Sequence, residues 1–170
     1  MQQAAAGTRE AYGQIFRLHR ERAYGLAFHY TKNKEDAMDV VQDAFMRAYL
    51  NLNKFDLRRE FRPWILSIVR NLAIDLLRKR KRTRTDELPA GLPEPSNQSH
   101  ADEKLLQREI WDLLNQLSKD QREIIFLKDY QGHSYGEIAA IVDIPLGTVM
   151  SRLHHARKKL AELLRDGRNG

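Results

Sequence analysis

The side chains best suited to chemistry lie on one face of the last predicted helix. Stepping about 100° per residue from Val149 places polar and basic residues opposite its apolar stripe, namely Ser151, His154, His155 and Lys158. Arg152 and Arg157 flank this face, where long cationic side chains can reach phosphates. Gly147 and Thr148 open the helix, where backbone N–H groups can also meet a phosphate. The pattern indicates contact with a polyanion, although a solvated basic face on an ordinary helical hairpin would look similar.

Two predicted helices joined by a tight turn position these side chains. The first has an apolar face formed by Ile138, Ala139, Ile141 and Val142. The turn at 143–145 breaks the periodicity, because Pro145 lacks a backbone donor and disfavours helix at the residue before it. The second helix has apolar residues at offsets of four, three and four, namely Val149, Leu153, Ala156 and Leu160. Small Ala139 is expected where the helices cross, which completes a helix-turn-helix pattern.

The predicted helix at 34–52 combines acids with exposed apolar residues. Its buried stripe has helical spacing and comprises Ala37, Val40, Val41, Ala44, Phe45, Ala48 and Leu52. The opposite face presents Asp39, Gln42, Asp43, Met46 and Leu50. Flexible Met46 among acids would suit an adaptable docking surface. A neighbouring helix could equally cover this face, and the periodicity leaves both interpretations open.

The loop at 53–62 and the helix after it carry aromatic and basic side chains. Phe55 and Phe61 lie among Arg58, Arg59 and Arg62, a mixture that can hold a splayed base. Either ring can instead anchor the loop to the core, which we expect of Phe61. Pro63 is placed to start a helix, with an apolar face of Trp64, Ile65, Ile68, Val69, Leu72 and Leu76. That helix runs into 78–84, where six of seven residues are basic and can attract phosphates.

The composition excludes several classes of function. There are 29 Lys and Arg against 23 Asp and Glu, and this net charge of +6 weakly favours a polyanionic partner. The absence of cysteine excludes disulfides, thiolate zinc sites and cysteine nucleophiles. No apolar run approaches the roughly 20 residues that span a bilayer, and residues 1–7 lack the features of a signal peptide. We expect a soluble, cytoplasmic protein with no metal, cofactor, membrane insertion or small-molecule substrate.

A change in composition divides the chain. Residues 85–103 contain no Lys or Arg, five acids and three of the five prolines, which predicts an extended acidic linker. We therefore place an N-terminal domain at 8–83, the linker at 84–103 and a C-terminal domain at 104–166. No strand pattern occurs, so the predicted fold is all-α, with two small helical domains.

The remaining predicted helices complete both domains. Residues 10–31 predict one or two helices, and residues 104–117 predict another. Ser118 is placed to cap the next helix, with Gln121 completing a capping box. Gly132 is its expected C-cap. The core face of this helix is expected to hold Ile124, Ile125, Leu127 and Tyr130.

The chain resembles the sigma-70 family of bacterial RNA polymerase sigma factors, in particular the small extracytoplasmic-function (ECF) group. The likeness extends over about residues 10–165. Its motifs lie within 35–48, 61–78, 117–139 and 144–160. They include Glu35, Asp36, Gln42, Asp43, Phe61, Trp64, Arg70, Asn71, Asp75, Arg78, Ser118, Gly147, Thr148, Ser151, Arg152 and Arg157. Each motif is moderately specific, and their order across a linker makes the match strong.

This resemblance implies a promoter-specific transcription initiation factor that an anti-sigma factor regulates. The surface docking the clamp helices of core RNA polymerase would comprise Asp39, Gln42, Asp43 and Met46. The melted −10 element would contact Lys54, Phe55, Arg58, Arg59, Phe61, Arg70, Asn71 and Arg78. The −35 duplex would contact Gly147, Thr148, Met150, Ser151, Arg152, His154, His155, Arg157 and Lys158. The acidic linker would pass through the cationic product channel of the polymerase.

The sequence departs from the family pattern at a few positions. Met150 and His155 stand where relatives commonly have arginine, and His154 where some have an apolar residue. These positions are expected to face DNA, so the −35 sequence read by this chain cannot be copied from its relatives. Pro63 replaces the usual small polar residue before the tryptophan.

Two other classes of protein share parts of the pattern. A dimeric helix-turn-helix regulator would explain the C-terminal domain, but it leaves the acidic face and the basic helix without a role. A metal-dependent nuclease could use Asp36, Asp39 and Asp43. The helix dipole already accounts for acids at the start of a helix, and no histidine is placed beside them.

Overall fold

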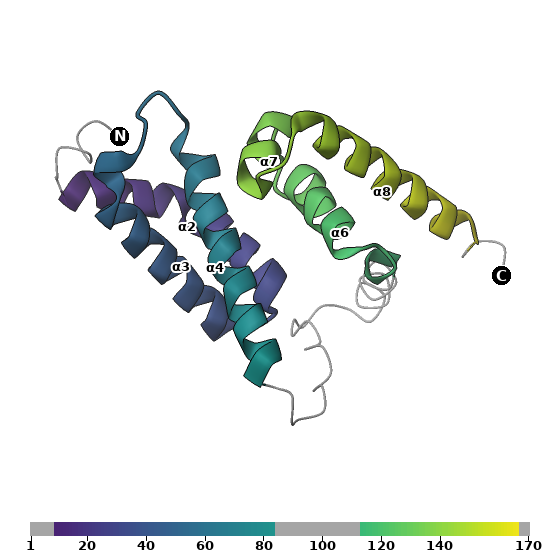
Figure 1. The fold of residues 1–170 in the computed structure, drawn as a ribbon, viewed down its shortest axis with the longest axis horizontal. Coiled ribbons are helices and arrows are strands. Elements are labelled where there is room, and N and C mark those ends of the chain that lie inside the picture. Colours follow the sequence, from purple (N-terminus) through teal and green to yellow (C-terminus); the bar gives the residue numbers. More distant parts are fainter. Residues whose placement is uncertain (1–8, 84–112, 167–170) are drawn as a thin grey trace, which may run out of the picture. The chain divides into compact units, whose positions relative to one another are not determined.

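The computed structural model describes residues 9–83 and 113–166, and the regular elements in these ranges are all helical (Figure 1). The predicted all-α class is confirmed. The predicted linker at 84–103 and the first part of the predicted helix at 104–117 lie outside the described residues. None of the described helices combines the length and the apolar character needed to cross a bilayer.

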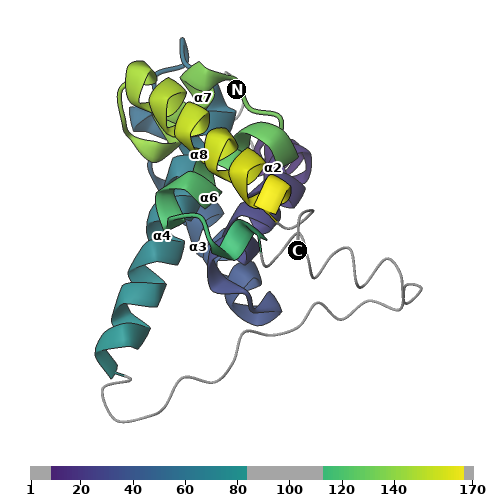
Figure 2. The ribbon, with the colours of Figure 1, turned by 90° about the vertical axis from the view of Figure 1, so that its right-hand side faces the viewer.

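Three long helices form the N-terminal domain. They are α2 (Arg9–Thr31), α3 (Lys34–Leu50) and α4 (Phe61–Thr83), and each packs against the other two. A short 3₁₀ turn, η1 (Leu52–Lys54), starts the loop between α3 and α4. The last turns of α4 extend beyond the other two helices (Figure 2), so the basic end of this helix is open to solvent.

Helix α3 folds as its sequence pattern predicts. The Asn33 side chain caps it by accepting a hydrogen bond from the Asp36 N–H at 3.1 Å. Glu35 and Asp36 lie in the first turn, where the helix dipole favours acids. Every member of the predicted stripe is buried, including Leu52 just beyond the helix. Met46 and Leu50 are exposed, so no described helix covers the acidic face.

Helix α4 differs from the prediction in its start and in its buried face. It begins at Phe61, two residues before Pro63. The helix tolerates proline there because N–H groups in its first turn have no partner within the helix, so none is lost. Its fully buried residues are Ile65, Leu66, Val69 and Ala73. Ile68, Leu72 and Leu76 are only partly buried. The buried face is rotated from the predicted one because α4 packs against both α2 and α3.

The C-terminal domain contains a capped helix that ends in a wide turn. Ser118 and Gln121 form the predicted capping box of α6 (Lys119–Ile125). The chain continues into the π-helical turn η2 (Phe126–Tyr130), in which the Gln131 N–H donates to the Phe126 carbonyl at 3.0 Å. This wider turn rotates the residues after it to a different side of the helix. Tyr130 is therefore 80% exposed, and its predicted place in the core is wrong.

The helix-turn-helix is present as α7 (Tyr135–Val142) and α8 (Leu146–Asp166). A second capping box, formed by Ser134 and Glu137, starts α7. Asp143 ends it in the left-handed conformation, with φ of 58°, so the chain reverses before Pro145. Val149, Leu153 and Ala156 are buried, and α8 packs against α6.

Candidate functional site

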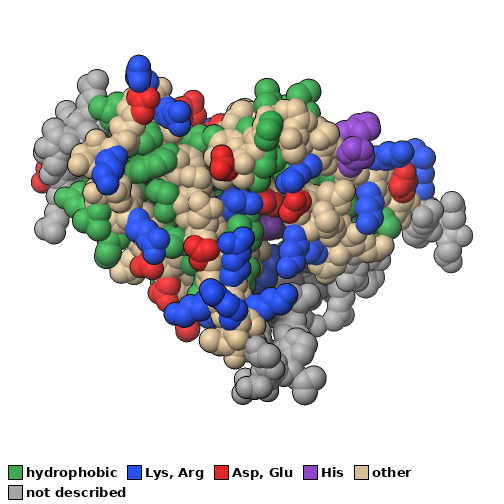
Figure 3. All heavy atoms as spheres, viewed as in Figure 1, with side chains coloured by type: hydrophobic (Ala, Val, Ile, Leu, Met, Phe, Trp, Pro, Cys, Tyr) green, Lys and Arg blue, Asp and Glu red, His purple; other side chains and the backbone are tan. Residues whose placement is uncertain are grey.

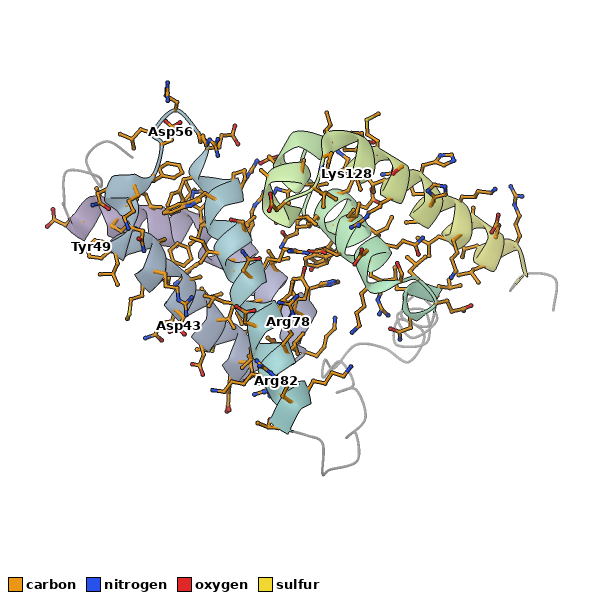
Figure 4. The ribbon with its side chains drawn as sticks, viewed as in Figure 1. Asp43, Tyr49, Asp56, Arg78, Arg82 and Lys128 are labelled. Carbon is orange, nitrogen blue, oxygen red and sulfur yellow. The ribbon has the colours of Figure 1, made fainter. Side chains whose placement is uncertain are left out.

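The acidic face of α3 borders an open apolar groove. Asp39, Gln42, Asp43 and Met46 are all exposed. The groove has a volume of about 890 Å³ between α2 and α3, and the predicted residues Gln42 and Met46 form part of its wall. The other residues lining it include Tyr12, Phe16, Met38, Phe45 and Tyr49. Asp43 and Tyr49 project from the same side of α3 (Figure 4). The structure thus joins acids and apolar side chains into one surface.

Tyr12 fixes one wall of this groove. Its hydroxyl donates to the backbone carbonyl of Phe45, and its ring lies 4.9 Å from that of Tyr49. Burial raises the pKa of Tyr12 to about 12, so its hydroxyl remains a donor at neutral pH. This hydrogen bond joins α2 to α3 beside the exposed acids and gives the groove a fixed shape.

Asp36 has a different role from Asp39 and Asp43. Its carboxylate accepts two hydrogen bonds from the Arg80 guanidinium, one of them from Nη2 at 2.6 Å. This pair joins the first turn of α3 to the basic end of α4, and only 13% of the Asp36 side chain is exposed. Within residues 9–83 and 113–166, no three His, Asp or Glu side chains are placed to share a metal ion. Asp36 therefore belongs to the packing of α3 on α4.

The aromatic side chains of the loop pack inward. Phe55 is 7% exposed and Phe61 is 5% exposed. Their ring centroids lie 4.6 Å and 5.5 Å from that of Trp64, and 5.8 Å from each other. Phe61 thus anchors the loop, as expected, and Phe55 does so too. In this conformation neither ring is available to stack on a base, which corrects their predicted place in the lining of the −10 pocket.

The basic side chains of the loop remain at its tip. Arg58 is bound to Asp56, with Nε 3.1 Å from Oδ1, and the Arg58 side chain is 91% exposed. The hydrogen bonds from Arg58 hold the pKa of Asp56 below its usual value. Asp56 lies at the outer end of the loop (Figure 4). Lys54 and Arg59 are also exposed, so the cationic part of the predicted −10 surface is open to a ligand.

A second pocket lies between the end of α3, η1 and α4. Its volume is about 430 Å³, and both Lys54 and Asn71 line it, as two of the predicted −10 residues. The prediction did not include the other lining residues, which are Arg47, Asn51, Trp64, Ile68, Leu72 and Asp75. Asn71 and Asp75 are one helical turn apart, a spacing that could have suggested a shared face. Arg78 lies 3.7 Å from Asp75 on the exposed side of α4.

His19 of α2 makes the N-terminal domain sensitive to pH. Its ring is half-buried, with its centroid 5.5 Å from that of Phe61. Burial lowers the pKa of His19, and Arg62 and Arg22 lower it further. The unfolded chain therefore binds a proton at a higher pH than the folded chain does, and stability falls as the pH drops through and below about 6.5.

We expect His19→Gln to reduce this pH dependence. Urea unfolding of both chains near pH 7.5 and near pH 5.5 measures it, because Gln cannot titrate. The wild-type chain should lose more free energy of unfolding than the variant does between these two conditions. An equal loss in both chains would show that groups other than His19 cause the dependence.

The predicted DNA-facing side chains of α8 lie on one exposed surface. Gly147, Met150, Ser151, His154, His155 and Lys158 are all exposed, while Thr148 is partly buried. The Ser151 hydroxyl donates to the Thr148 carbonyl at 3.1 Å, and the rings of His154 and His155 are 5.6 Å apart. Figure 3 shows histidine and basic side chains together on this helix. The predicted residues thus share one exposed face, and their contact with DNA stays a prediction. That prediction did not include the ion pairs of Arg152 and Arg157 beside the face.

A helix-turn-helix with a basic outer face, together with a helical domain that ends in a basic helix, defines a DNA-binding transcription protein. Two family descriptions match the chain in this order. Sigma-70 region 2 matches residues 15–83, and sigma-70 region 4 matches residues 107–160.

Individual proteins give the same result. The chain is 32% identical to the ECF RNA polymerase sigma factor SigW of Bacillus subtilis, over 98% of this chain and 95% of that protein. The structure of CnrH in complex with the cytosolic domain of CnrY superposes with a TM-score of 0.72 at 31% identity, covering 96% and 94% of the two chains. The sigma factor RpoE of Bartonella quintana, bound to the anti-sigma factor NepR, also gives 0.72 at 30% identity, covering 92% and 98%. The chain belongs to the ECF group of the sigma-70 family.

This membership decides between the alternatives. Sigma factors are transcription initiation factors that direct RNA polymerase to promoters, and they are not enzymes. The nuclease interpretation of the acids on α3 is therefore wrong. The dimeric regulator is wrong as well, because the family match includes the N-terminal domain.

Proposed function

We propose that this chain divides promoter-directed initiation among three surfaces: a core-docking face on α3, a −10 site between η1 and α4, and a −35 site on α8. The observation that carries this proposal is the match of both domains, in order, to the two conserved regions of sigma-70 proteins. Each surface has a chemistry suited to its task.

The acidic face of α3 and the groove beside it suit the clamp helices of core RNA polymerase. Exposed Asp39 and Asp43 offer charge for a basic partner, and Met46 with the groove offers apolar area. Charge complementarity speeds encounter and fixes register, while buried apolar contacts supply affinity. A helical partner that carries both basic and apolar side chains would thus bind along α3.

The pocket between η1 and α4 suits a base flipped out of the −10 element. Asn51, Asn71 and Asp75 offer donors and acceptors to the edge of a base, and Trp64 with Ile68 offers an apolar wall. Extruding a base costs a few kcal/mol, which a receiving pocket of this kind offsets. Lys54, Arg58 and Arg59 would contact the phosphates of the single strand, and Arg70 and Arg78 would follow its backbone. Phe55 and Phe61 would support the pocket from within the core.

Helix α8 suits the major groove of the −35 element. Its N-terminus offers the backbone N–H groups of Gly147 and Thr148 to a phosphate, and its exposed face presents side chains to base edges. Met150, His154 and His155 make this face unlike the arginine-bearing face that the family commonly has. Lys158, Arg152 and Arg157 would contact phosphates beside it.

Substitutions on this face should change which −35 sequence is preferred. We expect Ser151→Ala and His155→Ala to alter the order of preference among −35 variants, because base contacts carry sequence information. Each lost contact should change discrimination at one base pair by about 1–3 kcal/mol. Transcription from a library randomised in the −35 element measures the preference. If the same sequences are selected by both variants and the wild type, bases are read by other residues.

An anti-sigma partner and a cytoplasmic location complete the proposal. Two similar structures contain a bound second protein. CnrH is bound by the cytosolic domain of CnrY, and the sigma factor RpoE is bound by the anti-sigma factor NepR. We infer that a protein of this kind controls the present chain. RNA polymerase is cytoplasmic, so a chain that serves it would act there.

Binding to promoter DNA with and without core RNA polymerase tests the proposal. The chain should select promoter DNA over random DNA only when core polymerase is present. The control is the chain alone at the same concentration. Promoter-specific binding by the chain alone, which core polymerase leaves unchanged, would instead identify a free-standing regulator.

A further inference from the structure

The two arginines that flank the DNA-facing side of α8 are each paired with an aspartate from another element. Nη1 of Arg152 lies 3.0 Å from Oδ2 of Asp120, in the first turn of α6. Nη2 of Arg157 lies 2.6 Å from Oδ1 of Asp129, in η2. The first contact arises where α6 packs against α8, and the second joins α8 to the turn that follows α6. The cations on both flanks are thus already bound to carboxylates of the same domain.

We propose that Asp120 and Asp129 neutralise the charge of Arg152 and Arg157, and so limit the sequence-independent affinity of α8 for duplex DNA. This inference rests on the proposed function, because it requires that α8 bind DNA. Under this proposal, two acidic residues on α6 and η2, outside α8 itself, also control how tightly α8 binds DNA.

Each aspartate limits the affinity for DNA because its pair with an arginine has no net charge. A basic side chain adds affinity for DNA largely by displacing counterions from phosphates, so a free arginine contributes about one phosphate contact to the salt dependence. An arginine beside an aspartate carries no net charge into the interface. The carboxylate of the aspartate stays close to the approaching phosphate and repels it. The hydrogen bond from Arg157 to Asp129 raises the pKa of Arg157, so the guanidinium stays charged.

The exposure of the pairs decides whether the aspartates weaken DNA binding or assist it by holding the arginines in place. The side chains of Asp120 and Asp129 are 59% and 44% exposed, and those of Arg152 and Arg157 are 33% and 49% exposed. Ion pairs this exposed hold a side chain only weakly, so the aspartates add little rigidity to the arginines. Their negative charge acts over a longer range than their hydrogen bonds do, and repulsion of the phosphate is therefore the larger effect.

The test uses Asp120→Asn and Asp129→Asn in the 170-residue chain. Asparagine can still accept a hydrogen bond from arginine, so each change removes the charge and keeps the shape. The matched control is Asp143→Asn, since Asp143 forms no ion pair with α8 in the described residues and its left-handed conformation accepts Asn. Fluorescence anisotropy over a series of NaCl concentrations, with the chain bound to core RNA polymerase, gives the affinity for a duplex with a selected −35 element and for a scrambled duplex.

We expect each of the two variants to bind both duplexes about three to ten times more tightly near 0.1 M salt. The plot of log affinity against log salt should become steeper by about one. The ratio between the two duplexes should stay the same, because phosphate contacts carry no sequence information. The Asp143→Asn control should change affinity by less than either variant does.

A double-variant cycle shows whether Asp120 acts through Arg152. Arg152→Ala alone should weaken binding to both duplexes and flatten the salt dependence. With Arg152→Ala in place, Asp120→Asn should tighten binding by less than it does beside Arg152, because it then removes the repulsion of the phosphate but frees no arginine. Unchanged or weaker binding by both Asn variants would overturn the inference and leave the proposed function in place. If Arg152→Ala and Arg157→Ala together leave DNA binding unchanged, the proposed role of α8 fails instead.

Discussion

Replacing Asn71 with Ala should reduce promoter melting by about tenfold or more. Asn71 lines the pocket between η1 and α4, and its amide is one of the few groups there that can hydrogen-bond to a base edge. Losing such a contact costs about 1–3 kcal/mol, and about 1.4 kcal/mol corresponds to a factor of ten. Permanganate footprinting or a fluorescent base in the −10 element measures the fraction of open complex.

The choice of Asn71 separates function from folding. Its side chain is exposed on a helix, where alanine is the better helix former, so the variant should be at least as stable as the wild type. Gln14→Ala is the matched control, because it removes an exposed helical amide from α2, which does not line this pocket. Normal melting by Asn71→Ala, or an equal defect in Gln14→Ala, would place the flipped base in another site.

Reversing the charge of Asp43 should weaken binding to core RNA polymerase by about 10- to 100-fold. Asp43 is exposed on the acidic face of α3, away from the buried stripe. A lysine there would face the basic side chains of a complementary partner, and like charges across an interface cost several kcal/mol. Competition for core polymerase against a labelled wild-type chain measures the affinity.

Glu35→Lys provides the comparison on the same helix. It makes the same change of charge at an exposed position in the first turn of α3, about two helical turns from Asp43. There lysine opposes the helix dipole by about 0.3–1 kcal/mol, which leaves the fold intact. If both variants lose affinity equally, net charge explains the effect; if Asp43→Lys binds normally, the docking face lies elsewhere.

Helix-level features could be predicted because they depend on local spacing. The stripe of α3 is correct at every position, since apolar residues recur once per turn and this helix buries one side. For α4 the same method found Ile65 and Val69 but missed Leu66 and Ala73, because this helix packs against two neighbours at once. The start of α6 was predictable, since Ser118 and Gln121 have the spacing of a capping box.

The site was less predictable where it depends on contacts between distant residues. Phe55 lies in a polar loop, and only its packing against Trp64 shows that it supports the pocket and does not line it. The pairing of Asp129 with Arg157 joins residues 28 positions apart and follows from the π-helical turn and the packing of α6 on α8. No sequence period carries that information.

Run-off transcription with purified core RNA polymerase on a promoter library tests the central claim most directly. The account predicts that adding this chain selects a subset of promoters that share one −35 and one −10 element, and that core polymerase alone gives no specific start. Initiation that is equally unspecific with and without the chain would contradict it.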